Sequence, residues 1–252
     1  MTRPLKDQSS RKPRRQFIEE LAAGAAALAA AACAPAAAAA SAASQAPAPA
    51  GPTPSPAPPP MATTPEKWDT SWMERITAKH KAVFDSPEIA EGTALYLAMS
   101  YLGSVKDVFG TGDSDASVVC VLRHRAVPML FNDAMWAKYD IGAQTSTNDE
   151  KTKKPATRNI FYQKVDAQGT PVDDDKPSST IKSLSKRGVI FVGCDMATRG
   201  FSSRIAQKTK QDQHAIYEEL KQNLVPGATL MQTGIFATLL AQEAGCSFMK
   251  AT

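Results

Sequence analysis

Cys194 is the residue in this sequence whose type and position point most directly to chemistry. It follows the apolar run Gly188-Val189-Ile190-Phe191-Val192-Gly193, and such a run predicts a strand buried on both faces of a parallel sheet. Where a strand gives way to the start of a helix, backbone N–H groups favour the thiolate form of a cysteine. A thiolate is a nucleophile and can carry sulfur, so Cys194 is the candidate persulfide carrier. The alternative is an unreactive structural thiol.

A second polar group, Arg123-His124-Arg125, follows another apolar run, over residues 117–122. Ligands of open α/β sheets bind beyond the carboxyl ends of the strands, so His124 and Cys194 would face one edge if the two strands are neighbours. His124 is a candidate base or anion binder. Arg123 and Arg125 are candidates for binding an anionic sulfur species or a carboxylate, and strand alternation places them on one side, opposite His124. The alternative is a strand-end cap flanked by solvated arginines.

The other cysteines and histidines of the domain are interpreted as structural. Cys120 lies inside one predicted strand and Cys246 begins another, which is typical of inert core thiols. His80 and His214 have no metal-ligand spacing with a cysteine or a carboxylate, so no metal site is expected. No glycine-rich loop with dinucleotide spacing follows a predicted strand, so no cofactor is expected either.

These residues need a scaffold of alternating strands and helices to bring them together. Residues 81–85 predict a short strand, after which Pro87 is expected to open a helix that Gly110 ends. Glu88 and Glu91 would lie in the first turn of this helix, where the helix dipole favours acids. Further strands are expected at 117–122, 188–193, 228–231 and 246–249, and further helices near 127–139, 178–186, 211–223 and 234–244, the last ended by Gly245. This rhythm predicts a parallel sheet with helices on both faces.

The segment 142–177 is long for a loop inside a compact domain. A loop of this length is usually functional, disordered or partly structured. Within it, Ile160-Phe161-Tyr162 predicts an added hairpin strand.

The charge of the chain argues against a nucleic-acid partner. The formal net charge is +4, but six of the 29 basic and three of the 25 acidic residues precede residue 61. The remaining 23 basic and 22 acidic residues nearly balance, so no basic face is left for a phosphate backbone. The cluster Lys151, Lys153 and Lys154 is interpreted as a solvated loop.

Residues 1–43 are interpreted as a twin-arginine signal peptide. Arg14-Arg15 precede an aromatic and an aliphatic residue, an Ala-rich and weakly apolar stretch spans 21–32, and small residues at 38–42 offer cleavage sites. Charged, apolar and small residues in this order are typical of exported proteins, and the apolar stretch is too short to span a bilayer stably. The protein is therefore expected in the periplasm. Two acidic residues within the segment favour the alternative of an Ala-rich disordered leader.

A Pro/Ala-rich linker is expected over residues 44–65, followed by the α/β domain over 66–252. Such a tract forms an extended, semi-stiff spacer rather than a core. Cys33 follows Ala30-Ala31-Ala32, which loosely resembles a lipobox. Lipidation of Cys33 is therefore an alternative to plain cleavage, and it alone would bring the protein to a membrane.

Several segments together resemble the DsrE/DsrF-like sulfur-relay family. The C-terminal signature is carried by Leu224-Val225-Pro226-Gly227, Gly234-Ile235 and Leu240-Ala241-Gln242-Glu243-Ala244-Gly245-Cys246-Ser247-Phe248. The segment Val121-Leu122-Arg123-His124-Arg125-Ala126-Val127-Pro128 is similar to the second strand and turn of that family, and Cys194 is similar to its strand-closing cysteine. The resemblance covers most of residues 79–250 apart from the inserted loop.

This resemblance implies a three-layer α/β fold with a mostly parallel five-stranded sheet, and a tendency to form homo-oligomers. Members of the family pass persulfide sulfur between cysteines, so Cys194 would be both acceptor and donor. Its partner would be a sulfur-donor or sulfur-acceptor protein, or a small thiol. One feature of this chain is distinctive: Asp195 places a carboxylate beside the thiol, which would oppose a negative charge on the sulfur.

Two functional hypotheses remain open at this stage. The first is an exported domain that binds or relays sulfur, or a related thiol ligand, through Cys194, with at most a carrier or transferase-like activity. The second is a non-catalytic binding or assembly module that uses the same fold as a scaffold. A third, an exported oxidoreductase with an organic cofactor, has no cofactor-binding loop to support it.

Overall fold

The structure is a computed structural model that describes residues 68–166, 168–172 and 177–252. From Trp68 to Thr252 the chain belongs to one compact unit. The expected signal peptide, the spacer and Cys33 lie outside the described residues. Within the described part, no helix combines the length and the apolar character needed to cross a membrane.

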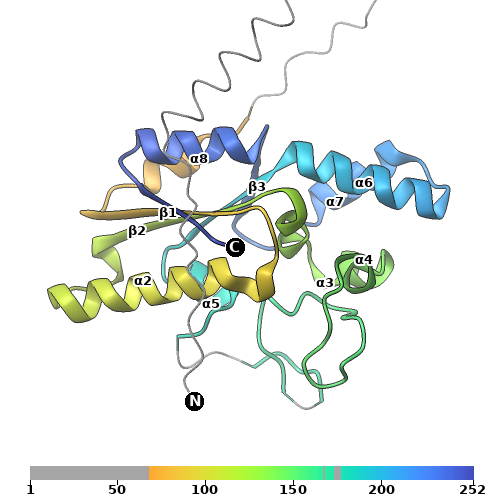
Figure 1. Cartoon of the computed structure of the whole chain (residues 1–252), viewed down its shortest axis with the longest axis horizontal. Helices are drawn as coiled ribbons and strands as arrows, with labels where there is room; N and C mark the ends of the chain where they lie inside the picture. Colours follow the sequence, from red (N-terminus) through yellow and green to blue (C-terminus); the bar gives the residue numbers. More distant parts are fainter. Residues whose placement is uncertain (1–67, 167, 173–176) are drawn as a thin grey trace, which may run out of the picture. The chain divides into compact units, whose positions relative to one another are not determined.

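The centre of the unit is a five-stranded sheet in which every pair of neighbouring strands is parallel, in the order β4-β3-β2-β1-β5. This confirms the predicted three-layer α/β fold (Figure 1). In parallel strands the carboxyl ends meet at one edge, so the residues after β1, β2 and β3 become neighbours. The strands are β1 (His80–Ser86), β2 (Ala116–Leu122), β3 (Ile190–Cys194), β4 (Ala228–Met231) and β5 (Ser247–Lys250).

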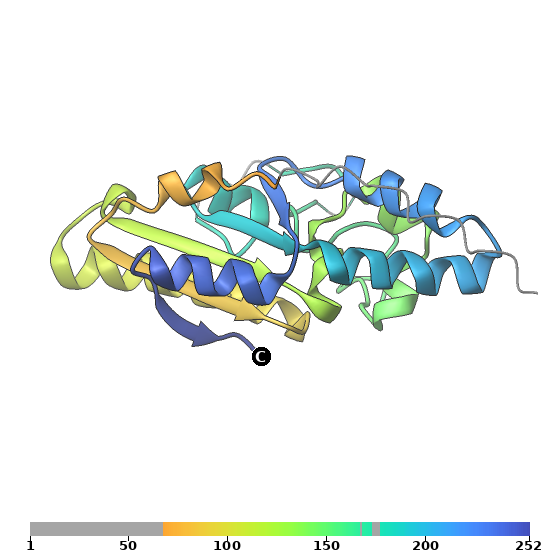
Figure 2. The same cartoon turned by 90° about the horizontal axis from the view of Figure 1, so that it is seen from above.

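Helices cover both faces of the sheet. One face carries α2 (Thr93–Phe109) and α5 (Ile181–Lys186), and the other carries α8 (Gly234–Glu243) and the short helix η1 (Ser71–Arg75), as Figures 1 and 2 show. Two further helices, α6 (Asp195–Thr209) and α7 (Gln213–Gln222), extend beyond the carboxyl ends of the strands (Figure 2). The remaining short elements are η2 (Ala90–Gly92), η3 (Asp113–Asp115), η4 (His124–Leu130), α3 (Asp133–Lys138) and α4 (Ile141–Thr145).

The buried strands divide their side chains between two apolar clusters. In β2, Cys120 and Leu122 pack into the cluster under α2, whereas Val119 and Val121 pack into the cluster under α8. Strand β3 behaves in the same way, because Phe191 joins the first cluster and its neighbours join the second. A strand with two buried faces must be apolar at every position, which explains why these runs are continuous in sequence.

The expectation that Pro87 opens a helix is wrong. The α-helix begins at Thr93, because Ala90, Glu91 and Gly92 have φ values of 41°, 54° and 83°. A right-handed helix cannot pass through three successive left-handed residues. The helix does end where expected, since Gly110 has a φ of 66° and donates its N–H to Lys106.

The helix expected near 127–139 is shorter than predicted. Residues His124–Leu130 form the 3₁₀ helix η4, which contains Pro128, and the α-helix α3 covers only Asp133–Lys138. Asn132 caps α3 by accepting a hydrogen bond from the backbone N–H of Met135 at 3.2 Å. Asn132 is therefore the N-cap of α3.

In the described part of the long loop, the hairpin strand expected at Ile160-Phe161-Tyr162 is absent, because these residues form a turn. Asn159 explains the turn: its side-chain amide donates to the carbonyl oxygens of Met129 at 2.7 Å and Phe131 at 2.8 Å. Phe161 is consequently buried against Trp136, with 6.1 Å between the ring centroids. The loop is therefore part of the core rather than an excursion from it.

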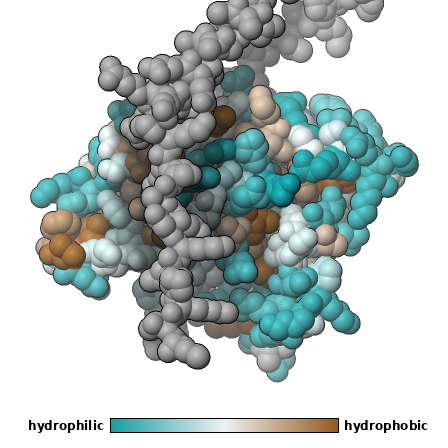
Figure 3. Space-filling model, in the orientation of Figure 1, coloured by the Kyte–Doolittle hydropathy of each residue, from teal (hydrophilic) through white to brown (hydrophobic). Residues whose placement is uncertain are grey.

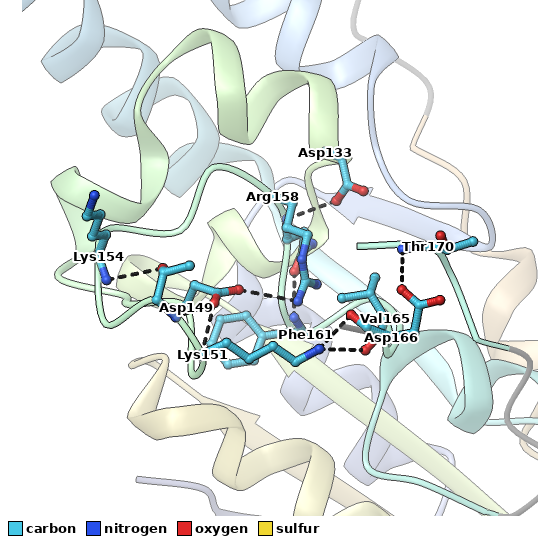
Figure 4. Close-up of polar contacts among 11 residues, drawn as sticks. Asp133, Asp149, Lys151, Lys154, Arg158, Phe161, Val165, Asp166 and Thr170 are labelled. Atoms are coloured by element: carbon cyan, nitrogen blue, oxygen red, sulfur yellow. Dashed lines mark hydrogen bonds and ion pairs between the residues drawn. The ribbon is translucent and has the colours of Figure 1, made fainter. Parts of the chain in front are cut away.

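Charged side chains hold the outer part of the loop together (Figure 4). Arg158 Nη2 lies 3.5 Å from Asp149 Oδ2, and Lys151 Nζ donates to the carbonyl oxygen of Asp166 at 2.5 Å. The expected solvated lysine cluster thus contains at least one lysine that bridges two turns of the loop.

A glycine in this loop gives a test of its packing. A Cβ atom at Gly142 would lie 2.2 Å from the carbonyl oxygen of Ala156, whereas one at Gly103 in α2 would meet nothing within 4 Å. Because the obstacle is backbone, Gly142→Ala is expected to lower the free energy of unfolding by about 1–3 kcal/mol. Gly103→Ala should instead raise it by about 0.5–1 kcal/mol. Denaturant unfolding measures both, and equal stabilities for the two variants would contradict the packing described.

Candidate functional site

An open cleft of about 1100 Å³ lies at the carboxyl ends of the central strands. Its lining includes Arg123, His124, Arg125 and Cys194, so the structure brings together all the candidate site residues. They meet because β2 and β3 are neighbours in the sheet, with Leu122 paired to Gly193.

Cys194 is both the last residue of β3 and the N-cap of α6. Its Sγ accepts a hydrogen bond from the backbone N–H of Ala197 at 3.3 Å. The thiol is only 7% exposed, but it lines the cleft, so a small ligand has a route to it. The N-terminus of a 15-residue helix directs partial positive charge at this sulfur.

The carboxylate of Asp195 does not line the cleft and is engaged by other side chains. It is buried, and it accepts hydrogen bonds of 2.6 Å from Arg199 Nε and from the hydroxyl of Tyr217. Arg199 also lies over the Tyr217 ring, 4.0 Å from its centroid. The negative charge of Asp195 is therefore paired and used to attach α6 to α7. Sequence analysis did not predict this cluster of Asp195, Arg199 and Tyr217. The i,i+4 spacing of Asp195 and Arg199 is a pattern that could have predicted their ion pair.

Arg123 is held by Asp85, a buried residue near the end of β1. The two side chains form a fork, with 2.6 Å between Nε and Oδ1 and 2.8 Å between Nη2 and Oδ2. The hydrogen bond to Asp85 raises the pKa of the Arg123 guanidinium, burial opposes this, and charge on Asp85 and Cys194 raises it further. Arg123 is thus a fixed cation within electrostatic reach of the thiol.

His124 lies on the exposed rim of the cleft, in a left-handed backbone conformation with φ of 47°. This conformation ends the strand alternation, so the expectation that His124 faces away from Arg123 and Arg125 is wrong: all three line one cleft. Ala90 and Ser146, with φ of 41° and 54°, are also left-handed and also line it. Left-handed non-glycine residues are uncommon and gather at functional sites.

The rim of the cleft is electropositive. Arg125 is an exposed side chain whose Nε lies 4.0 Å from Glu88 Oε2, and Arg204 on α6 is exposed, with its guanidinium 5.2 Å from the Phe201 ring centroid. Among the described lining residues, Glu88 is the only acidic one. Several cations against one carboxylate favour an anionic ligand.

Two parts of the cleft wall were missed by the sequence analysis. Gln144, Thr145 and Ser146, at the start of the inserted loop, form part of one wall. The N-terminus of α8 forms another, and there a Cβ at Gly234 would lie 2.6 Å from the Cβ of Arg123. Glycine is needed at this position because the Arg123 side chain passes directly over it.

The other described cysteines and His80 pack against neighbouring residues outside the cleft. Cys120 and Cys246 are buried free thiols, and burial raises the pKa of both, with Lys81 partly offsetting the effect at Cys246. His80 stacks on Phe109 at 4.2 Å, at the end of α2 where apolar side chains gather on the surface (Figure 3). In the part of the chain that the structure describes, no three His, Cys, Asp or Glu residues are grouped to hold a metal.

The difference between the thiols predicts selective alkylation. Iodoacetamide should modify Cys194 in the folded protein on the order of tenfold or more faster than Cys120, because only Cys194 lines the cleft and only Cys120 is enclosed by the sheet. Peptide mapping after short exposures measures this, with urea-unfolded protein as the control in which all thiols react. An unmodified Cys194, or one joined to Cys120 or Cys246 in a disulfide, would be the opposite result.

Gly234 and Gly200 form a matched pair of cleft glycines. Gly234→Ala should displace Arg123 from its fork with Asp85 and lower the free energy of unfolding by about 1–3 kcal/mol. Gly200→Ala should be neutral or stabilising, because the nearest atom to its Cβ would be Arg204 Nη1 at 4.0 Å. Denaturant unfolding checks both. If Gly234→Ala were as stable as Gly200→Ala, the proximity of Arg123 would not constrain the cleft.

No protein-family model matches this chain, and no curated protein does. Among solved structures, the chain is similar to a protein of unknown function, MTH1491, from Methanobacterium thermoautotrophicum. The two share 13% identity over 68% of this chain and 99% of that chain, with a TM-score of 0.34. Similarity at this level carries no functional argument, so the resemblance to the sulfur-relay family stays a prediction.

Proposed function

We propose that this domain is a sulfur carrier of the DsrE/DsrF type, which receives and passes on sulfane sulfur through Cys194. The observation that carries the proposal is the position of the Cys194 sulfur at the N-terminus of α6, inside a cleft lined by arginines and a histidine. A persulfide is an anion at neutral pH, and both the helix dipole and the cationic lining would stabilise it.

The transfer is a balanced exchange that needs no outside oxidant. The Cys194 thiolate attacks the outer sulfur of a donor persulfide, R–S–SH, and the S–S bond of the donor breaks as a new S–S bond forms. The products are Cys194–S–SH and the donor thiolate R–S⁻. An acceptor thiolate reverses the step and restores the Cys194 thiolate. His124 and Arg123 would stabilise the negative charge that moves between the sulfur atoms.

Export is part of the same proposal and rests on the sequence alone. A twin-arginine signal would deliver the domain to the periplasm already folded, with the Pro/Ala spacer leading into it. Lipidation of Cys33 is the alternative that would keep the domain at a membrane.

A second candidate function, a non-catalytic assembly module, is favoured by exposed apolar side chains. Ile235, Phe236 and Leu239 on α8 are exposed, and so are Phe248 and Met249 on the edge strand β5. Exposed apolar surface of this kind marks interaction sites, and it fits the expected homo-oligomer. An assembly module should keep its oligomeric state, and its partner if one is found, in a Cys194→Ser variant.

Polysulfide loading tests the sulfur-carrier proposal. After incubation with polysulfide, the peptide that contains Cys194 should gain about 32 Da, the mass of one sulfur atom, and lose it on reduction. Cys194→Ser should abolish the gain, whereas Cys246→Ser should keep it. Loading that is absent, or that persists in Cys194→Ser, would contradict the proposal.

A further inference from the structure

We infer that the sulfur donor or acceptor of this cleft is a small thiol that carries a carboxylate, held by Arg125 and Arg204 while its sulfur reaches Cys194. This inference rests on the proposed sulfur-carrier function and names the chemical class of its partner.

The first observation that supports the inference is that the arginines of the cleft differ in pairing and exposure. Arg123 already donates to both oxygens of Asp85, and its side chain is only 17% exposed. Arg125 is 80% exposed, and its one ion-pair contact, with Glu88, is long at 4.0 Å. Exposed cations with loose partners can exchange them for a ligand carboxylate at little cost. Arg123 therefore remains a fixed cation near the Cys194 sulfur. The exposed arginines at the rim, Arg125 and Arg204, are available to bind the ligand carboxylate.

The position of Arg204 is the second observation that supports the inference. It lies on α6, the helix that Cys194 caps, and both residues line the cleft. The guanidinium is 5.2 Å from the Phe201 ring centroid, and Phe201 lines the cleft as well. A guanidinium over an aromatic ring is partly preorganised. A ligand carboxylate bound there would lie in the same cleft as the sulfur acceptor.

Size and depth favour a small molecule over a folded protein. The cleft of about 1100 Å³ is slightly larger than the typical range for small-molecule sites, about 300–1,000 Å³. At 7% exposure, the Cys194 thiol is recessed, so a cysteine on the surface of a globular donor would need a projecting arm to meet it. A free thiol of the size of a short peptide enters without that requirement.

The polar walls suit the same kind of ligand. Ser146 from the inserted loop and Thr233 at the N-terminus of α8 line the cleft. The α8 N-terminus adds a second helix dipole that favours negative charge. A peptide-like thiol with carboxylates would be complementary to such a lining, whereas an uncharged thiol would leave the cations unused.

Rates of persulfide transfer to Cys194 from two donors test the inference. Glutathione persulfide is the probe that carries carboxylates and 2-mercaptoethanol persulfide is the probe that lacks them, each followed by the mass of the Cys194 peptide. Wild-type protein should react roughly three- to tenfold faster with the carboxylate-bearing donor. This preference should fall at high salt, because the rim charges are exposed.

The variants identify the groups responsible. Combining Arg125→Gln with Arg204→Gln should remove the preference, because the rate with glutathione persulfide should fall more than the rate with 2-mercaptoethanol persulfide. Glu88→Gln should increase the preference, since it releases Arg125 from its competitor. Lys208→Gln is the matched control, because Lys208 is an exposed cation on α6 that is not among the cleft-lining residues; it should behave like wild type.

Each outcome decides between the two proposals. Equal rates with both donors, or a preference that survives the double arginine variant, would overturn the inference but leave the sulfur-carrier function standing. Failure of Cys194 to load from either donor would overturn the sulfur-carrier function, and the inference with it. Loss of the preference in Lys208→Gln would show a general charge effect and would also overturn the inference.

Discussion

The fork between Asp85 and Arg123 is the interaction on which the cleft depends. It joins the carboxyl ends of β1 and β2 with bonds of 2.6 and 2.8 Å, and the Arg123 stem passes over Gly234 at the start of α8. Three segments far apart in sequence are thereby fixed around one cation. Removal of one partner from a largely buried pair costs about 3–5 kcal/mol. The pair therefore specifies the shape of the cleft as well as its charge.

The position of the Cys194 sulfur also depends on the carboxyl ends of the strands. Strand β3 lies beside β2, so its last residue, Cys194, emerges next to Arg123. The helix that starts there directs an N–H group at the sulfur, and Asp195 is drawn away by Arg199 and Tyr217. The carboxylate of Asp195 is therefore already paired with Arg199 and Tyr217, although it directly follows the cysteine in sequence.

The sheet could be predicted from the sequence because its strands are apolar for a local reason: both faces of β2 and β3 are buried. The expectation that Cys194 and His124 lie at one edge of the sheet depended on β2 and β3 being neighbours, and the structure pairs these two strands. Other features depend on contacts between distant segments, and no local pattern encodes them. Asp85 has the sequence pattern of an ordinary strand-end acid, and only the fold shows that Arg123 pairs with it. Gln144 begins an expected loop, and only the fold shows that it lies in α4 and lines the cleft. The left-handed turn at Ala90 and Glu91 was mistaken for part of a helix because Pro87 and the acids Glu88 and Glu91 have the pattern of a first helical turn.

The proposed relay is tested most directly by following one labelled sulfur atom through Cys194. The protein is loaded from a ³⁵S-labelled polysulfide, freed of donor, and mixed with an acceptor thiol in a single turnover. A carrier should lose its label from the Cys194 peptide as an equal amount of labelled acceptor persulfide forms, with the Cys194 thiol regenerated. Label that stays on Cys194, or that is found on Cys246 instead, would contradict a relay through the cleft.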